Sequence, residues 1–378
     1  MGIDLFFCTV QVYPYKSILY KKGDPDSRLI ITAPHGGYYG RDDDDERLEK
    51  IEVNGEPKNL TSLPSRTGEG VTTWSDGYTK ELAKQLQEDV ESKLGIKPHL
   101  IVFNIARKRV DVNRSSCRNC PDCKDKDCAC TKEHNKDCLV VFDEYHKKIS
   151  DVKEQISQLG RGLIFDLHGH NHKHKRTEFG YHLSGCRITI LDECTDDPCE
   201  WSVNSDEKRN LIYAKDTSMY KLLDEEDYMN IREFIFGESS MGGLLEEQDD
   251  GTGKFDAIPS PSKKRPDDCH SLEADADIDG YYSGGYSVST HGSTYDEEKE
   301  GPKGDVDAIQ IEVPPQHRCG ETCTSKKGDE REKQKEEQVS RDFCEFLETS
   351  VLALLDLKVG QVCHTYQFKD HTMVHSLS

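Results

Sequence analysis

The feature that most constrains the fold is an apolar run that ends abruptly in polar residues. Residues 162–170 read Gly-Leu-Ile-Phe-Asp-Leu-His-Gly-His, so a predicted buried strand delivers an acid and two histidines at its carboxyl end. An earlier run, Leu29-Ile-Ile-Thr-Ala-Pro-His35-Gly-Gly, has the same form. Open α/β sheets place their ligands just outside the carboxyl ends of the strands. The two runs together therefore predict a metal site on an α/β sheet.

Length and charge narrow the choice of partner. The chain has 378 residues, which is enough for one large domain or two ordinary ones, and its net charge is −22. Such a surface repels nucleic acids and anionic membranes, so we expect neither as a partner. No apolar stretch approaches the roughly 18–20 residues that a membrane-spanning helix needs. A small anionic substrate is still compatible, because local arginines can hold it.

Strand-like and helix-like patterns alternate along the chain. This alternation predicts a three-layer α/β fold, with a mixed, mostly parallel sheet flanked by helices. Strands are expected at 29–33, 99–104, 163–165 and 308–313, with a further extended piece at 181–190. Helices are expected from Ser75-Asp76 to Gly95 and over 140–159, 218–236 and 338–357.

A single domain is expected to include all of these elements, over residues 29–360. Residues 1–28 are then an N-terminal extension and 361–378 a C-terminal tail. A cysteine-rich loop inserts at 115–138, and 249–275 reads as a surface loop because it is rich in Pro, Ser, Asp and Gly.

Catalytic zinc usually has three protein ligands and one open position for water. His35 and His168 supply two, and Asp76, at a predicted helix start, is a natural third. Each histidine alone is more often a turn or strand-end residue, but the pair, each followed by glycine, favours the metal interpretation. The tandem acids Asp42–Asp45 compete for the third place, although such runs are typical of solvated loops.

Two neighbours of His168 are expected to support it rather than bind the metal. Asp166 precedes it by two residues and is expected to orient a ligand histidine from behind. His170 follows it by two and is close enough for a similar place. The later alternation of His and Lys, at 171–175, is typical of an exposed loop.

Four bases stand out after the second predicted strand, in a chain that is otherwise acidic. Arg107, Lys108, Arg109 and Arg114 lie within one short loop, together with Asn113. The planar fork of arginine suits a carboxylate, because it can donate two parallel charge-assisted hydrogen bonds, and Asn113 adds a donor. The alternative is a basic loop that neutralises the acids of the chain itself.

Glu312 lies in an otherwise apolar predicted strand, Ala-Ile-Gln-Ile-Glu-Val. A carboxylate there is costly unless it is paired or functional. Near a metal site it can serve as the general base that activates water and then protonates the leaving nitrogen. The alternative is a strand glutamate that faces solvent.

A series of short motifs in a fixed order resembles the N-formylglutamate amidohydrolase family, from about residue 29 to 350. The matching segments are Pro34-His35-Gly36-Gly37, Asp76-Gly-Tyr-Thr, Arg107-x-Arg-x-Asp111-x-Asn113-Arg114, Asp166-Leu-His168-Gly-His170, Gly237-Glu-Ser-Ser-Met-Gly-Gly, Pro259-Ser-Pro, Ser283-Gly-Gly-Tyr286, His291-Gly-Ser293 and Gln310-Ile-Glu312. Each segment alone is a weak signal, and their order and number carry the resemblance.

The resemblance implies a zinc carboxypeptidase-like fold that holds zinc by His35, Asp76 and His168, with Glu312 as the catalytic carboxylate. Asn113 and Arg114 match the pair with which zinc carboxypeptidases hold a terminal carboxylate. Arg107 or Arg109 is then left to stabilise the oxyanion or a second carboxylate. The implied activity is hydrolysis of an N-acyl, for instance N-formyl, amino acid. The alternatives are a carboxypeptidase or peptidoglycan-type amidase acting on a larger substrate, and a non-catalytic binding protein on the same fold.

Fifteen cysteines leave both the compartment and a second metal undecided. The spacing from Cys117 to Cys130 suits a second zinc site, but dense cysteines in such a loop equally suit disulfides.

Overall fold

The computed structural model describes residues 15–39, 50–118, 125–131, 136–172, 176–185, 187–188, 214–225, 231–237, 240–247, 257–259 and 282–319. The helix expected over 338–357, the expected C-terminal tail and most of the expected surface loop at 249–275 lie outside these residues.

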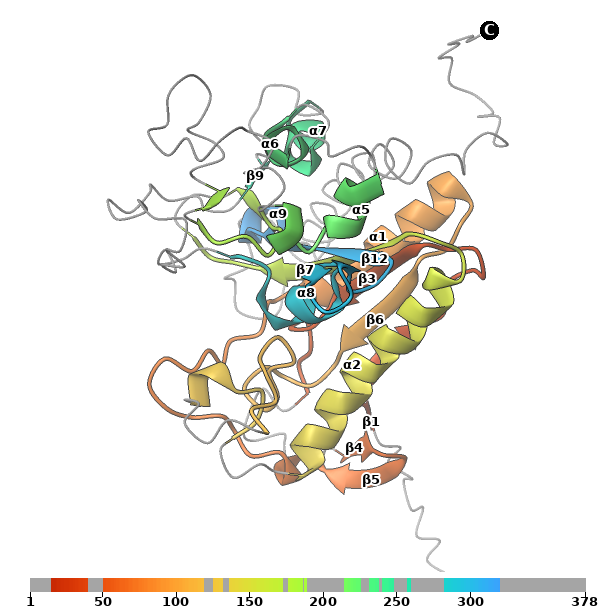
Figure 1. Cartoon of the computed structure of the whole chain (residues 1–378). Coiled ribbons are helices and arrows are strands. Elements are labelled where there is room, and N and C mark those ends of the chain that lie inside the picture. Colours follow the sequence, from red (N-terminus) through yellow and green to blue (C-terminus); the bar gives the residue numbers. More distant parts are fainter. Residues whose placement is uncertain are drawn as a thin grey trace, which may run out of the picture.

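A seven-stranded mixed sheet forms the centre of the molecule (Figure 1). Its strands are β2 (Ile18–Lys21), β3 (Leu29–Ala33), β6 (His99–Phe103), β7 (Gly162–Gly169), β8 (Thr177–Gly180), β9 (Ala257–Pro259) and β12 (Val306–Val313), in the order β2-β6-β3-β7-β12-β8-β9. The four central strands β6, β3, β7 and β12 run parallel. By contrast, β2 is antiparallel to β6 and β8 to β12. The predicted α/β class with a mixed, mostly parallel sheet is confirmed.

Helices cover both faces of this sheet. One face carries α1 (Thr79–Leu94), α5 (Tyr220–Glu225), α6 (Ile231–Phe236) and α7 (Met241–Glu247), whose apolar residues share one buried cluster with the sheet. The other carries α2 (Lys136–Ser157), the long yellow helix of Figure 1, and α8 (Gly285–His291). The short α9 (Pro315–Cys319) follows β12. Among the described helices, none is both long and apolar enough to cross a membrane.

Smaller elements complete the described part of the chain. A three-stranded sheet of β1 (Tyr15–Lys16), β4 (Lys50–Val53) and β5 (Glu56–Asn59) lies near one end of α2 (Figure 1), and β10 (Tyr295–Asp296) pairs with β11 (Gly301–Pro302). Two short 3-10 helices span Leu60–Ser62 and Asp125–Asp127.

The two faces of the central strands differ in a way that locates the site. Side chains alternate between the faces along a strand. The α1 face is apolar along the whole length of these strands, through Leu29, Ile31, Ala33, Leu163, Phe165, Leu167, Ile309, Ile311 and Val313. The α2 face begins apolar, with Ile30, Ile164 and Ala308, and becomes polar toward the carboxyl ends. The strands are therefore anchored by one face while the other delivers polar groups.

Several boundaries differ from those predicted. Strand β7 runs through Gly169, beyond the predicted 163–165, so Asp166 and His168 lie within the strand rather than after it. The extended piece expected at 181–190 is wrong for the residues described there, because the chain is already paired as β8 and turns away after Gly180. In addition, β2 comes from the expected N-terminal extension and β9 from the expected surface loop.

A pair of histidines joins α2 to α8. His146 Nδ1 lies 2.9 Å from His291 Nε2, and the two rings stack with centroids 5.1 Å apart. His146 Nε2 donates to the carbonyl of Val112 at 2.9 Å, which leaves Nδ1 as the acceptor. Burial lowers the pKa of His146 to about 4 and holds the pKa of His291 well below its usual value. Both rings are therefore neutral at neutral pH.

We expect the free energy of unfolding to fall as the pH drops below about 6.5. Unfolded histidine has the higher pKa, so unfolding takes up protons and acid favours it. For His146 the loss reaches about 3 kcal/mol by pH 4, since one pKa unit is worth about 1.4 kcal/mol. Urea unfolding from about pH 7.5 to about pH 4.5 measures the slope. A His146→Gln variant should have a shallower slope, and an equal slope would contradict this account.

Candidate metal centre

Rows of side chains cross β3, β7 and β12 on the α2 face, because these three strands pair in parallel and in register. Thr32, Asp166 and Gln310 form one row, and His168 and Glu312 form the next toward the carboxyl ends. Thr32 Oγ1 donates to Asp166 Oδ1 at 2.5 Å. The strands thus place a histidine and a glutamate side by side, both almost fully buried.

His35 enters the site from the loop that follows β3 and is fully buried. The next two glycines fit where no other residue would. A Cβ at Gly36 would lie 2.6 Å from the backbone nitrogen of Lys80 on α1, and one at Gly37 would lie 2.3 Å from the carbonyl carbon of Asn104. The loop therefore passes tightly between α1 and the end of β6, and this close passage fixes where His35 points.

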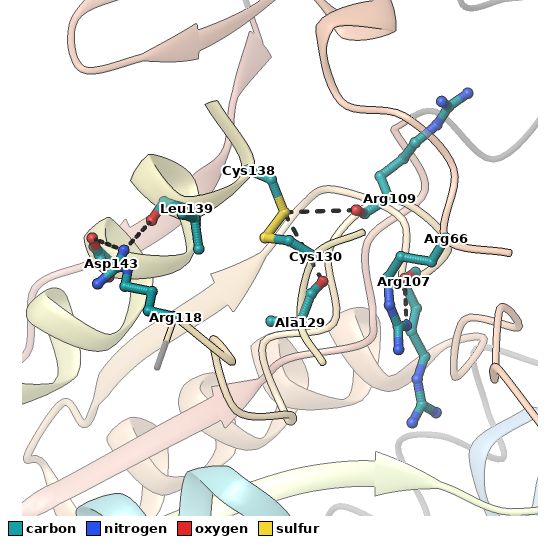
Figure 2. The surroundings of a disulfide bond; sticks show 9 residues. All are labelled: Arg66, Arg107, Arg109, Arg118, Ala129, Cys130, Cys138, Leu139 and Asp143. Carbon is teal, nitrogen blue, oxygen red and sulfur yellow. Dashed lines mark hydrogen bonds and ion pairs between the residues drawn. A yellow bond between two sulfur atoms is a disulfide. The ribbon is translucent and has the colours of Figure 1, made fainter. Parts of the chain in front are cut away.

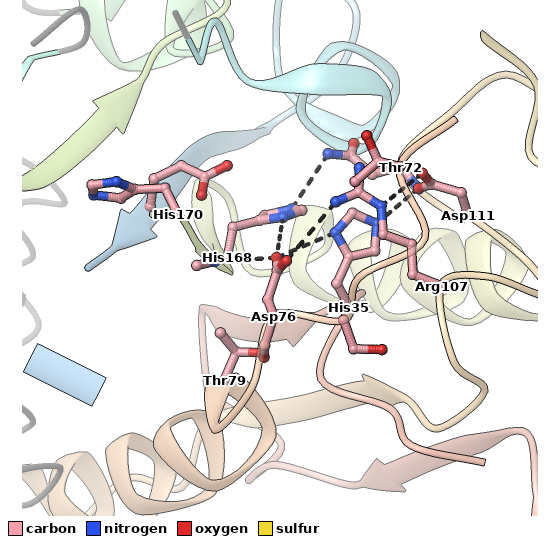
Figure 3. A network of polar contacts seen from close by, with 12 residues as sticks. His35, Thr72, Asp76, Thr79, Arg107, Asp111, His168 and His170 are labelled. Carbon is pink, nitrogen blue, oxygen red and sulfur yellow. Dashed lines mark hydrogen bonds and ion pairs between the residues drawn. The ribbon is translucent and has the colours of Figure 1, made fainter. Parts of the chain in front are cut away.

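One carboxylate oxygen of Asp76 brings the two histidines together (Figure 3). Asp76 Oδ2 lies 3.3 Å from His35 Nδ1 and 3.2 Å from His168 Nδ1. The backbone N–H of Gly169 also donates to Asp76 Oδ2, at 3.1 Å. The two imidazole rings lie edge to face, with centroids 4.7 Å apart. His35, Asp76 and His168 each offer a ligand atom within 4.8 Å of the others, so the three could hold a metal ion.

The outward nitrogens of the two histidines also contact carboxylates. His35 Nε2 lies 2.7 Å from Asp111 Oδ1, and His168 Nε2 lies 3.1 Å from Asp166 Oδ2. Histidines that bind metals usually donate their second N–H to such an acceptor, which fixes the tautomer and the ring orientation. The same arrangement on both rings leaves Nδ1 of each as the nitrogen that faces the centre.

The charges around the centre favour a cation within it. Burial alone would lower the pKa of His168, but Asp166 and Asp76 outweigh it and raise that pKa to about 10. Burial raises the pKa of Asp111, yet Arg107 and His35 together hold it well below its usual value. The carboxylates of Asp76 and Asp111, whose pKa values lie well below the usual range, are therefore ionised, and they stabilise positive charge where the two Nδ1 atoms meet.

Glu312 has the opposite character. Burial raises its pKa to about 7, with Asp76 and Glu178 adding to the rise and His168 and Arg107 opposing it. Gln310 Nε2 donates to Glu312 Oε1 at 2.7 Å and holds the carboxyl group in place. The carboxyl group is buried beside His168 rather than exposed, so the solvent-facing alternative is wrong.

The three arginines and the asparagine predicted to act at the site, all in the 107–114 loop, lie in different surroundings. Arg107 borders the centre: its Nε donates to Asp111 Oδ2 at 2.9 Å, and its Nη1 lies 3.8 Å from Asp76 Oδ1. Arg109 points elsewhere and donates to the carbonyl of Leu63 at 2.7 Å; Figure 2 shows its side chain directed away from that of Arg107. The structure thus brings Arg107 to the site and ties Arg109 to a neighbouring loop.

The predicted Asn113–Arg114 clamp is only partly available. Asn113 Oδ1 accepts a hydrogen bond from the backbone N–H of Ser287 at 2.9 Å, and its Nδ2 lies 3.4 Å from His168 Nε2. Arg114 donates to the Asn113 carbonyl at 2.9 Å and is partly exposed. Asn113 therefore joins α8 to the site, and Arg114 is the member of the pair that lies toward solvent.

His170 does not contact the three central residues. It is buried, its Nε2 lies 2.7 Å from the carbonyl of Arg176, and its Nδ1 accepts the backbone N–H of His172 at 3.0 Å. It forms a second group of possible ligands with His172 and Glu178. Because both of its ring nitrogens bond to backbone groups of the loop after β7, we interpret His170 as a residue that shapes this loop.

Two disulfides occur in the described part of the cysteine-rich insertion. Cys117 pairs with Cys128, and Cys130 pairs with Cys138 at the start of α2 (Figure 2). These sulfurs are not available as metal ligands, so the possible second zinc at Cys117–Cys130 is not supported. Residues 119–124 and 132–135 of the insertion lie outside the described residues.

The disulfide-linked segment holds the loop that carries Asp111. The backbone N–H of Asp111 donates to the Ala129 carbonyl at 2.9 Å, and the Ala129 N–H donates to the Ser115 carbonyl at 2.8 Å. Cys138 Sγ lies 3.9 Å from the carbonyl oxygen of Arg109 (Figure 2). The insertion thus fixes the position of the carboxylate behind His35.

Sequence reasoning missed three residues of the site. Asp111 lies within a motif of the resemblance, but the arginines on both sides of it favoured a substrate-binding interpretation of that motif. Arg66, whose Nη1 lies 3.3 Å from Asp111 Oδ2, lies ten residues before Asp76, and Arg318 lies six residues after Glu312, but neither belongs to a motif that marks it.

The donor set fits a zinc ion. Two imidazole nitrogens and one carboxylate oxygen are the ligands that catalytic zinc sites commonly use, and they leave a position for water or substrate. A cysteine-free set of nitrogen and oxygen donors, with carboxylates behind both histidines, also agrees with this chemistry.

Comparisons with known proteins leave the family open. No protein-family model matches the chain, and no curated protein matches it. It is similar to the structure of gene product Atu2144 from Agrobacterium tumefaciens, at 10% identity and a TM-score of 0.42, over 91% of this chain and 95% of that one. It is also similar to the apo form of the N-acetylmuramyl-L-alanine amidase Ami1 from Mycobacterium abscessus, at 10% identity and a TM-score of 0.27, over 87% and 99%. Likenesses this low decide nothing, so the resemblance to the N-formylglutamate amidohydrolases stays a prediction.

We expect Asp76→Ala to weaken zinc binding by about 100-fold or more, since it removes a ligand, and Asp111→Asn to weaken it by roughly 10- to 100-fold. Competition against a chromophoric chelator measures both affinities. Asp143→Asn is the control, because Asp143 is an exposed partner of Arg118 and lies outside the site. Wild-type affinity in Asp76→Ala would show that the three residues do not form the metal centre.

Proposed function

We propose that the chain is a zinc-dependent amidohydrolase that cleaves the amide bond of an N-acyl amino acid. The observation that carries the proposal is the register of β7 and β12, which pairs Glu312 with His168. Three residues that could hold a metal ion are also found in many binding proteins that catalyse no reaction. A buried carboxyl group held next to them, with no structural ion pair of its own in the described residues, suits proton transfer at that group.

His35 Nδ1, His168 Nδ1 and Asp76 Oδ2 would hold the zinc ion. When bound, zinc supplies Lewis acidity, which polarises an amide carbonyl and makes a water molecule more acidic. Asp111 and Asp166 keep the two histidines in the tautomer that presents Nδ1.

Glu312 is the proposed general base. As a carboxylate it accepts a proton from the attacking water, and as a carboxylic acid it then donates that proton to the leaving nitrogen. A pKa near neutrality suits both steps, because neither form of the group is strongly disfavoured. Gln310 orients the carboxyl group through its hydrogen bond to Oε1.

Arg107 is the proposed electrostatic partner of the reaction. It contacts Asp111 and lies near Asp76, so its guanidinium borders the ligands and stabilises negative charge that develops on the substrate carbonyl oxygen. Arg114, partly exposed at the same loop, is a proposed contact for the substrate from the solvent side. Arg109 is not included, because its guanidinium is bound to the Leu63 carbonyl.

We expect Glu312→Gln to retain zinc and to lose hydrolysis of N-formyl and N-acetyl amino acids. General acid–base catalysis typically contributes 10²–10⁴-fold, so kcat should fall by about 100-fold or more. The amide keeps the volume of the side chain and its hydrogen bond to Gln310, but it cannot accept the proton. Rates are measured by the release of the free amino acid.

Glu297→Gln is a matched control, because Glu297 is an exposed residue between β10 and β11. Zinc content is measured on both variants. If Glu312→Gln keeps the wild-type kcat with one zinc bound, Glu312 is not the base. If the wild-type protein binds zinc and hydrolyses none of these substrates, the proposed activity is wrong.

A further inference from the structure

Arg318 is a buried guanidinium near the candidate ligands Asp76 and His168, and no sequence motif marks it. It lies on α9 and is only 6% exposed. Its Nη1 donates to the carbonyl of Gly77, and its Nη2 donates to the carbonyl of His170 at 3.3 Å. Gly77 directly follows Asp76, and His170 lies two residues after His168. Arg318 therefore connects the two segments that carry these ligands.

A glycine makes room for this arginine. A Cβ at Gly169 would lie 2.4 Å from both Cζ and Nη1 of Arg318 and 2.8 Å from its Nε. The guanidinium thus lies directly against the backbone of Gly169, whose N–H donates to Asp76 Oδ2 at 3.1 Å. Only a residue without a side chain at position 169 allows Arg318 to lie so close to the candidate ligands Asp76 and His168.

The positive charge of Arg318 has no direct partner among the residues that the structure describes. Its two hydrogen bonds go to neutral carbonyl groups, and its buried Nε has no acceptor. Arg66 and Arg107 differ, because both contact the carboxylate of Asp111. Burial lowers the pKa of Arg318, and the more distant charges of Asp76 and Glu312 oppose this. A buried guanidinium without a contacting anion is costly, so a ligand that supplies an anion is favoured.

The chemistry of the guanidinium indicates which anion fits. The planar guanidinium binds a carboxylate through parallel N–H donors, and this is the geometry for which arginine is better suited than lysine. A carboxylate in contact with this guanidinium would supply the counter-charge that the described residues lack. Asn113, from the predicted clamp, is neutral, and its donor atom Nδ2 already lies 3.4 Å from His168 Nε2.

We propose that Arg318 is a specificity-determining residue, whose guanidinium binds the carboxylate of the substrate. The inference rests on the proposed function and deepens it: the free carboxylate of the acyl amino acid is the group that the site recognises. Neutral amides of the same compounds are then poor ligands.

The test compares two ligands that differ only in charge, N-acetylglycine and N-acetylglycinamide. Calorimetry on the Glu312→Gln protein, with zinc and without it, gives affinities in the absence of turnover. Adding Arg318→Gln should weaken binding of the acid by roughly 10- to 100-fold, as expected for a hydrogen bond to a charged group, and leave the amide nearly unchanged. Gly169→Ala should act in the same direction, because its Cβ displaces the guanidinium while every charge is kept.

Arg118→Gln, which removes an exposed arginine paired with Asp143, is the control and should leave both affinities unchanged. Melting temperatures and zinc content show whether each variant keeps its fold and its metal. An equal loss for acid and amide, or a loss of acid binding in Arg114→Gln but not in Arg318→Gln, would overturn the assignment. Acid-selective binding that depends on Arg318, in a wild-type protein that hydrolyses no amide, would support the assignment and refute the proposed activity.

Discussion

The candidate site depends on the parallel, in-register pairing of β3, β7 and β12. Because the register is fixed, His168 and Glu312 must be neighbours, and Thr32 must meet Asp166 one row below. A shift of one residue in any of these strands would turn the polar row into the apolar face that α1 covers. The continuous apolar face prevents such a shift, so the packing that stabilises the sheet also sets the geometry of the site.

Around these strands, three carboxylates fix the orientation of the two histidines, His35 and His168. Asp76 joins them at one nitrogen each, while Asp111 and Asp166 hold the other nitrogens. Three acids around two imidazoles would be unfavourable if buried alone, and Arg66 and Arg107 offset part of their charge. Two disulfides then fix the segment against which the Asp111 loop forms its backbone hydrogen bonds. Arg318 lies against Gly169, and its guanidinium contacts no anion among the described residues.

The sequence predicts the fold class and the three possible ligands because both leave local patterns. Apolar runs that end in histidine mark the strands, and a helix-start acid marks Asp76. What it misses are contacts between segments distant along the chain. Asp111 reaches His35 across 76 residues, and Arg318 reaches Gly77 across 241, so neither has a local signature. Arg109 shows the converse: it shares a loop with Arg107, but the loop directs the two side chains to different neighbours.

X-ray absorption at the zinc edge of the reconstituted full-length protein tests the central claim most directly, because it reports which atoms hold the metal. The account predicts one tightly bound zinc with nitrogen and oxygen neighbours only, two of them imidazoles, and loss of one imidazole in His168→Ala. Sulfur neighbours would place the metal in the cysteine-rich insertion instead. An unchanged spectrum in His168→Ala would likewise contradict a centre built from His35, Asp76 and His168.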